Sequence, residues 1–148
     1  MIVERQECSV INGDLSMLPV LLEKLSSIME DLGFSPDEIG DAELALDEAV
    51  TNIIEHGYRG KTGKITLRCT GSAGRIMIAV EDTAPKFDPL SVPPPSLGDD
   101  LDERQIGGLG VMLIRGVMDT CRYEYRDGKN ILTMEKMHAN NSDSGGHT

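Results

Sequence analysis

The stretch from Leu44 to Gly57, which reads LALDEAVTNIIEHG, constrains the fold more than any other part of this chain. Its apolar residues recur at the three- and four-residue steps of an amphipathic helix. Together with Ala42, which lies just before the stretch, the apolar face consists of Leu46, Ala49, Val50 and Ile53. Glu48, Asn52 and His56 follow one another at four-residue intervals, so a helix would align them along one edge of the apolar face. The pattern predicts a helix that buries one face and presents three polar groups beside it.

Local signals set the ends of this helix and predict another helix before it. Residues 35–38 read SPDE, a capping box with proline at the first helical position, so the helix should run from there to Gly57. With Ser16 as the N-cap of the earlier helix, Pro19 falls in the first turn, where its missing N–H has no partner in any case. The apolar face of that helix, which Gly33 ends, consists of Leu18, Leu22, Leu25, Met29 and Leu32.

The rest of the chain predicts strands, one long loop and a short helix. Stretches rich in β-branched and apolar residues predict strands, the last four as two hairpins, over residues 1–11, 64–70, 75–81, 123–127 and 130–137. Between the hairpins, residues 83–109 hold five of the seven prolines and an acidic cluster, which is typical of a lid or binding loop. Residues 111–118 then predict a short buried helix. Because helices and strands do not alternate, the expected fold class is an α/β two-layer sandwich, with a mixed, mostly antiparallel sheet and helices on one face.

Length and composition narrow the class of protein further. We expect one domain over residues 1–137 and a disordered polar tail over 138–148. Acidic residues number 25 against 14 basic ones, and the net charge of -11 argues against direct binding of nucleic acid. The three cysteines, Cys8, Cys69 and Cys121, are odd in number and widely spaced, which fits reduced thiols better than disulfide bonds. No apolar run is long enough to span a membrane. We therefore expect a cytoplasmic protein.

The three polar residues of the central helix have the chemistry of a phosphate-handling site, although polar residues on a helix flank more often form a solvated face. The carboxylate of Glu48 can orient or deprotonate a nucleophile. The amide oxygen of Asn52 suits Mg²⁺, and the imidazole of His56 can donate to a phosphate oxygen. These three residues are therefore candidates, and two later motifs make the case for a site.

Those motifs are a carboxylate at the end of a strand and a run of glycines before a helix. Asp82 ends the strand at 75–81; such a residue is often a turn former, but when buried it needs a donor, such as the exocyclic amine of adenine. The glycines of the GGLG run at 107–110 let backbone N–H groups approach a phosphate, although glycines before a helix also occur in ordinary loops.

The order of these motifs resembles the GHKL ATP-binding fold, which is shared by histidine kinases, gyrase B, chaperone ATPases and bacterial anti-sigma-factor serine kinases. The shared features are a helix with E-x-x-x-N, a strand ending in Asp, a long loop, GGLG before a helix, and a late strand with Thr. The resemblance is strongest to the RsbW and SpoIIAB type of serine kinase. It is carried by DEAVTNIIEHGY, VEDTAPKFDP and IGGLGVMLIRGVMD, and it spans roughly residues 1–137.

This resemblance implies a serine/threonine kinase that uses ATP and Mg²⁺. Glu48 matches the base that acts on the serine hydroxyl, and Asn52 matches the Mg²⁺ ligand. Asp82 matches the Asp that binds the adenine amine, and Thr133 the Thr of the adenine water network. The implied phosphate contacts are Arg104 in the lid and the glycines Gly107, Gly108 and Gly110.

One position departs from the family pattern. The first glycine box usually reads D-x-G, whereas here residues 82–84 read DTA. If this position has a positive φ, the Cβ of Ala84 costs on the order of 1–2 kcal/mol and crowds the nucleotide. We then expect ATP to bind roughly tenfold more weakly.

Three functions are consistent with these features. The first is a serine kinase that phosphorylates an anti-anti-sigma partner of the STAS type and sequesters a sigma factor or another regulator; the resemblance suggests a homodimer. The second is a non-catalytic nucleotide-binding module that acts by sequestration only, which Ala84 motivates. The third is an ATPase gate of the gyrase B or chaperone group, although the chain lacks the extra domains that such a gate would move.

Overall fold

The computed structural model describes residues 2–10, 16–91 and 103–139. Their elements, in chain order, are β1 (Ile2–Val10), α1 (Leu18–Asp31), α2 (Pro36–Asn52), a π-helical turn η1 (Ile53–Gly57), β2 (Gly63–Ser72), β3 (Arg75–Asp82), a 3-10 turn η2 (Pro89–Ser91), α3 (Glu103–Val117), β4 (Thr120–Arg126) and β5 (Lys129–Met137). The strands form one five-stranded sheet in the order β1-β2-β3-β5-β4.

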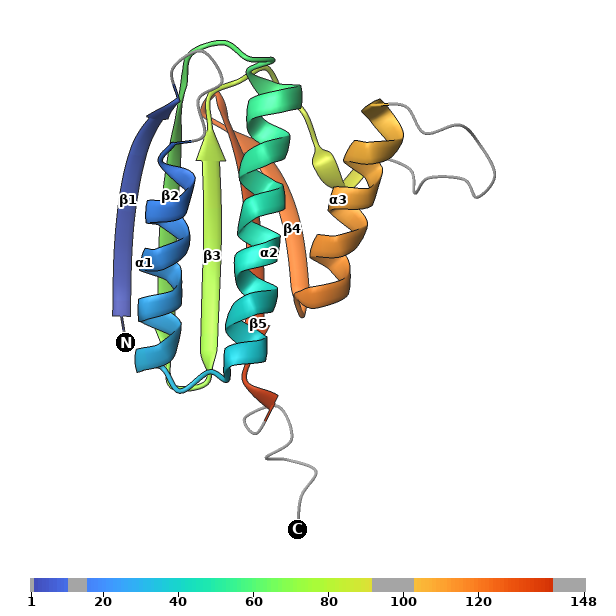
Figure 1. Cartoon of the computed structure of the whole chain (residues 1–148). Coiled ribbons are helices and arrows are strands. Elements are labelled where there is room, and N and C mark those ends of the chain that lie inside the picture. The colour runs from blue at the N-terminus through green and yellow to red at the C-terminus, as the bar shows by residue number, and fades with distance from the viewer. Residues whose placement is uncertain (1, 11–15, 92–102, 140–148) are drawn as a thin grey trace.

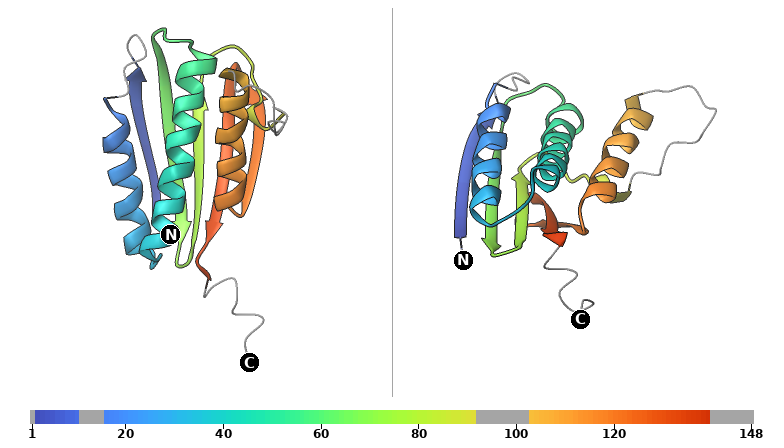
Figure 2. Two further views of the ribbon diagram at one scale, coloured as in Figure 1. Left: turned by 45° about the vertical axis from the view of Figure 1, so that its right-hand side comes forward. Right: turned by 60° about the horizontal axis from the view of Figure 1, so that its bottom comes forward.

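The two-layer architecture is confirmed. The three α-helices lie side by side on one face of the sheet, with α2 between α1 and α3 (Figures 1 and 2). Every strand pair among the described residues is antiparallel, so the sheet has no parallel component there. Because α2 is flanked by helices on both sides, its polar edge toward α3 is enclosed between two helices and the sheet.

The core lies between the helices and the sheet. Its largest fully buried side chains come from α1, α2, α3 and the three central strands: Leu21, Leu25, Met29, Leu46, Ile65, Ile76, Ile78, Val80, Ile114 and Met134. Burial of each such side chain contributes roughly 1.5–3 kcal/mol relative to exposure. The apolar face predicted for the long helix is therefore the face that holds α2 on the sheet.

The N-terminal ends of α1 and α2 follow the sequence signals with one difference. The capping box of α2 is present: the Ser35 hydroxyl accepts from the Glu38 N–H at 3.2 Å, and the Glu38 carboxylate accepts from the Ser35 N–H at 2.9 Å. The N-cap of α1 is Met17 and not the expected Ser16, and its side chain makes no capping hydrogen bond. The helix begins at Leu18, and Pro19 still lies inside the first turn, where proline is tolerated.

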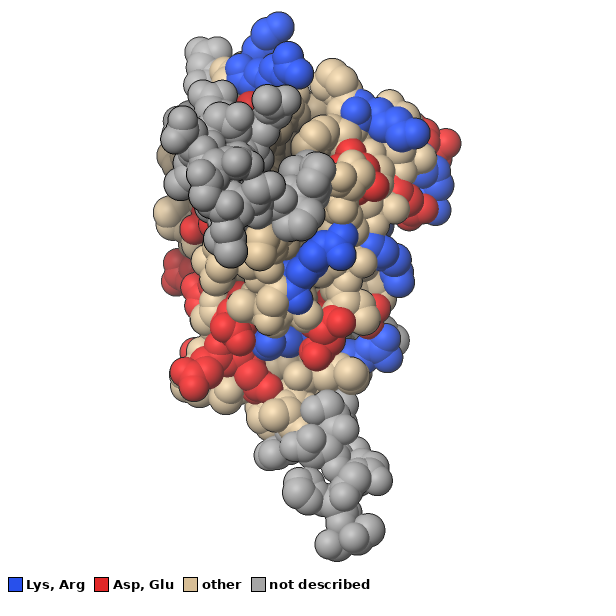
Figure 3. Space-filling model, turned by 90° about the vertical axis from the view of Figure 1, so that its right-hand side faces the viewer, with Lys and Arg blue, Asp and Glu red and all other residues tan. Residues whose placement is uncertain are grey.

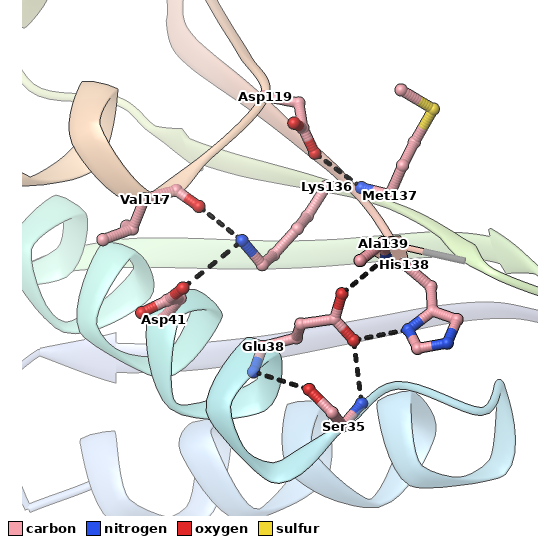
Figure 4. A network of polar contacts seen from close by, with 9 residues as sticks. All are labelled: Ser35, Glu38, Asp41, Val117, Asp119, Lys136, Met137, His138 and Ala139. Carbon is pink, nitrogen blue, oxygen red and sulfur yellow. Dashed lines mark hydrogen bonds and ion pairs between the residues drawn. The ribbon is translucent and has the colours of Figure 1, made fainter. Parts of the chain in front are cut away.

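Polar contacts join the end of β5 to α2 and α3 (Figure 4). Lys136, which is 8% exposed, donates to the Val117 carbonyl at the end of α3 at 2.6 Å and lies 3.5 Å from the Asp41 carboxylate of α2. Glu38 contacts His138 at 2.6 Å and accepts from the Ala139 N–H at 2.8 Å. The first two residues of the expected disordered tail are thus bound to α2, and residues 140–148 lie outside the described part of the chain.

Candidate nucleotide-binding site

A pocket opens between α2 and the segment after β3, above β3, β5 and β4. It has an empty volume of about 420 Å³, open solvent at its mouth included, and its mostly apolar walls are Ala49, Asn52, Ile53, Gly57, Val80, Asp82, Pro85, Phe87, Pro89, Tyr123, Asn130 and Leu132. An apolar pocket with a few convergent polar groups is the usual form of a small-molecule site. Its polar groups therefore decide what it can bind.

Asp82 supplies the carboxylate of the pocket. The side chain is buried, and its Oδ1 atom accepts from the Ala84 N–H at 3.0 Å and from the Asn130 amide at 2.9 Å. Within the described residues its Oδ2 atom has no hydrogen-bond partner. Burial raises the pKa of Asp82 above its ordinary value, and the hydrogen bonds from Asn130 and Ala84 oppose that rise. A buried carboxylate oxygen without a partner in a pocket calls for a ligand that donates a hydrogen bond.

Asn130 holds that carboxylate in place, although nothing in the sequence pattern singled it out. Its side-chain N–H group donates to Asp82, to the Ala84 carbonyl at 3.0 Å and to the Pro85 carbonyl at 3.3 Å. Its side-chain oxygen accepts from the Phe87 N–H at 3.0 Å and from the Tyr123 hydroxyl at 2.5 Å. Both ends of the amide are therefore satisfied, and Asn130 fixes Asp82 and the segment that follows β3.

Thr133, expected in the adenine site, does not reach it. Asn130 and Leu132 line the pocket and Met134 joins the core beneath the helices. Because successive side chains of a strand point to opposite faces, Thr133 points to the face away from the helices. The structure thus places Asn130, paired with Asp82 across β3 and β5, where the sequence resemblance had suggested Thr133.

Glu48 and Asn52 lie together where α2 meets α3. A Cβ built on Gly110 of α3 would lie 2.7 Å from the Glu48 Oε2 atom and 3.8 Å from the Asn52 Nδ2 atom. Contacts below 3.0 Å do not occur for real Cβ atoms, so Gly110 lets the two helices approach at this carboxylate. Burial, followed by the charges of Asp47 and Glu55, raises the pKa of Glu48. A carboxylate with a raised pKa is a stronger base once ionised.

His56 does not continue the row of Glu48 and Asn52. The helix changes to π-helical geometry at Ile53, where the Tyr58 N–H bonds to the Ile53 carbonyl at 2.8 Å. A π-turn holds more residues than an α-turn, so the predicted four-residue alignment ends there. His56 lines a neighbouring cavity, with its ring centroid 6.4 Å from that of Phe87, and is absent from the described walls of the Asp82 pocket.

The glycine motif lies inside a helix and not before one. Helix α3 begins at Glu103, four residues before Gly107, whereas the sequence predicted a helix from Val111. In an α-helix that begins at Glu103, the backbone N–H groups from Gly107 onward bond to carbonyls four residues earlier. The N–H groups of Gly107, Gly108 and Gly110 are therefore occupied in this conformation. Arg104 belongs to the first turn of α3, and its side chain lies outside the described part of the structure.

Ala84 is not strained. The non-glycine residues with positive φ, among those described, are Arg59 and Asp127, so Ala84 has an ordinary backbone conformation. Its side chain is buried at 3% exposure, and a Cβ added to Gly57 would lie 3.1 Å from the Ala84 Cβ. The strain energy that we expected for alanine at this position depended on a positive φ angle, and it is therefore absent.

Mg²⁺ fits this site only as an ion held jointly by the protein and the phosphates of a bound nucleotide. The described residues hold no group of three or more His, Cys, Asp or Glu side chains that could bind a metal ion. Asn52 lines the pocket, and Mg²⁺ is commonly held by one or two protein oxygens together with substrate phosphates and water. The residues therefore fit Mg²⁺ that arrives with a nucleotide.

Comparison with known protein families supports a nucleotide site. Residues 11–136 match the family described as the histidine kinase-like ATPase domain. The chain belongs to this family. Among curated relatives, Serine-protein kinase RsbW of Listeria monocytogenes is 32% identical over 113 residues, which cover 73% of this chain and 72% of that protein. Serine-protein kinase RsbW of Bacillus licheniformis is 31% identical over 126 residues, covering 82% of this chain and 79% of the relative.

A solved structure agrees with the fold. The crystal structure of the RsbU and RsbW domains of Rv1364c from Mycobacterium tuberculosis superposes with a TM-score of 0.59 at 15% identity, covering 90% of this chain and 32% of that longer one. Among the helices that the structure describes, none has the length and apolar character needed to cross a membrane. The family match and the curated relatives, rather than this superposition, show that the chain is a GHKL ATP-binding domain of the serine kinase group.

Proposed function

We propose that this serine kinase transfers the γ-phosphoryl group of ATP to a serine of a small STAS-type anti-anti-sigma protein. We further propose that it sequesters a sigma factor or a related regulator while the partner is phosphorylated, and that it acts in the cytoplasm as a homodimer. The curated relatives, which are named serine-protein kinases and align over most of both chains, support this reading. The alternative is a nucleotide-binding module that works by sequestration alone.

The observation that carries the proposal is the Asp82–Asn130 pair. It leaves a buried carboxylate oxygen without a partner in an apolar pocket, among the described residues. The exocyclic amine of adenine can donate to that oxygen, whereas the carbonyl of guanine at the same ring position cannot. We therefore assign the pocket to the adenine ring of ATP.

The remaining residues supply what phosphoryl transfer requires. Transfer needs positioning and charge stabilisation more than covalent help from the protein. Bound Mg²⁺ would neutralise charge on the phosphates, and Asn52 is the residue that would hold it. Glu48, with its raised pKa, would orient or deprotonate the acceptor serine.

In the described conformation α3 packs closely beside the half-buried Glu48 at Gly110, and the glycines of α3 are helical. We infer that the first turns of α3 must open before the glycine N–H groups can contact phosphates and a serine can reach Glu48. This would make the start of α3 part of a nucleotide lid that opens and closes with the ligand.

The test is transfer of label from γ-labelled ATP, with Mg²⁺, to purified STAS-type proteins from the same organism. The proposal predicts label on a serine of one such protein, located by mass spectrometry. Binding of nucleotide and partner without any transfer of label would establish the sequestration module instead.

A further inference from the structure

A second cavity adjoins the nucleotide pocket at the end of the molecule where the η1–β2 connection lies. Its empty volume is about 1130 Å³, open solvent included, and its walls come from two segments, residues 56–63 and 83–87. Gly57, Pro85 and Phe87 line both this cavity and the nucleotide pocket. The two sites therefore share a rim.

The second cavity is basic in a strongly acidic protein. Arg59, Lys61 and Lys86 line it and are exposed, and the described residues of its walls include no Asp or Glu. Within the described chain neither Arg59 nor Lys61 has an ion-pair partner, while Lys86 lies 5.8 Å from the centroid of the Tyr125 ring. On the face drawn in Figure 3, Lys and Arg side chains lie at the upper end of the molecule and also further down, where Asp and Glu side chains lie among them. Because the protein carries a net charge of -11, a cavity whose described walls hold three cations and no carboxylate repels an acidic partner less than the protein surface does on average.

The base of the cavity is held rigidly. The Tyr58 hydroxyl donates to the Lys64 carbonyl at 2.5 Å and accepts from the Thr83 N–H at 2.9 Å and the Lys64 N–H at 3.1 Å. Arg59 and Gly60 have φ angles of 53° and 79°, so a tight turn carries the two cations past Tyr58. A fixed base lowers the ordering cost of binding.

An exposed aromatic side chain on the shared rim favours a protein ligand over a small anion in the basic cavity. Phe87 is 39% exposed although its backbone N–H is fixed by Asn130. Aromatic anchors beside basic residues are typical of the contact regions of protein interfaces, whereas a small anion makes no use of an exposed aromatic ring.

We propose that this basic pocket docks an acidic segment of the protein whose serine is phosphorylated. The inference rests on the proposed function, because the shared rim places the docked segment next to the nucleotide. It adds a chemical description of the substrate: a serine-bearing protein with acidic residues near the acceptor. Docking electrostatics of this kind act on the affinity for the partner and depend on salt.

The experiment reverses charge in the pocket. In Arg59→Glu/Lys61→Glu the KM for the partner should rise tenfold or more at low salt, with kcat and ATP affinity within about twofold of wild type. The rise should shrink at high salt. Lys24→Glu, in which an exposed lysine of α1 is reversed, is the control and should leave KM unchanged.

Direct binding separates this inference from the proposed function. A fluorescent serine peptide flanked by Glu and Asp should bind the wild-type protein more tightly than its Gln and Asn counterpart, and the double variant should remove the difference. Equal binding of the two peptides, or phosphorylation with unchanged KM in the double variant, would overturn the docking inference while leaving the kinase assignment intact. A large loss of ATP affinity in the double variant would also overturn it, because the pocket would then hold the triphosphate.

Discussion

Replacing Gly107 and Gly108 by alanine tests whether α3 must unwind to bind ATP. Both residues lie in the helix that begins at Glu103, and glycine in a helix interior is about 0.8–1 kcal/mol less favourable than alanine. The double substitution should therefore stabilise the helical form by about 2 kcal/mol. If ATP binds only after this segment opens, its affinity should fall by roughly 15–30-fold.

Gly116→Ala provides the matched control. Gly116 lies near the C-terminal end of the same helix, and a Cβ added there meets no atom within 4 Å. Alanine at this site should raise helix stability by about half as much as the double substitution, without changing ATP affinity. The measurements are thermal melting and calorimetric titration with Mg-ATP. Unchanged affinity in the Gly107/Gly108 variant, or an equal loss in Gly116→Ala, would refute unwinding as a condition for binding.

Three further predictions follow from single residues. Asn52→Ala should abolish Mg²⁺-dependent ATP binding in calorimetry while melting stays close to wild type, and unchanged affinity would remove Asn52 as the metal ligand. Asp82→Asn should weaken ATP binding by roughly 1–3 kcal/mol, and GTP should bind the wild type poorly; equal affinity for ATP and GTP would contradict the adenine assignment. Burial raises the pKa of Glu38, but hydrogen bonds from Ser35, His138 and Ala139 outweigh it and lower the pKa from 4.5 to about 2. The stability that this carboxylate contributes is complete above about pH 4.5 and is lost as the pH falls toward 2. Acid unfolding of Glu38→Gln should lack that loss, on the order of 2–3 kcal/mol, and identical pH profiles would show that the carboxylate is not stabilising.

The elements set by local signals could be predicted from the sequence. The capping box at Ser35 begins α2 as expected, because both of its hydrogen bonds join residues three apart. The β2–β3 hairpin likewise follows from its own alternation and its turn. These elements in turn predicted the two layers and the position of Asp82 at a strand end.

What could not be predicted depends on contacts between distant segments. The sequence predicts too late a start for α3 because glycines discourage helix locally, whereas in the structure this helix packs against α2 at Gly110. The residues of β5 from Asn130 to Met134 are all buried, so both faces of the strand are covered there. The sequence therefore has no alternation of polar and apolar residues that would tell which side chains face the helices. Only the pairing of Asp82 with Asn130 across two strands identifies Asn130 as the partner of the carboxylate.

The central claim is that Glu48 serves phosphoryl transfer to a protein serine, and Glu48→Gln tests it most directly. The substitution keeps the size of the side chain beside Gly110 but removes the carboxylate. Phosphorylation of the partner should fall by 10² or more while ATP affinity stays within about threefold and melting is close to wild type. Phosphorylation at the wild-type rate by a folded, ATP-binding Glu48→Gln protein would contradict the account.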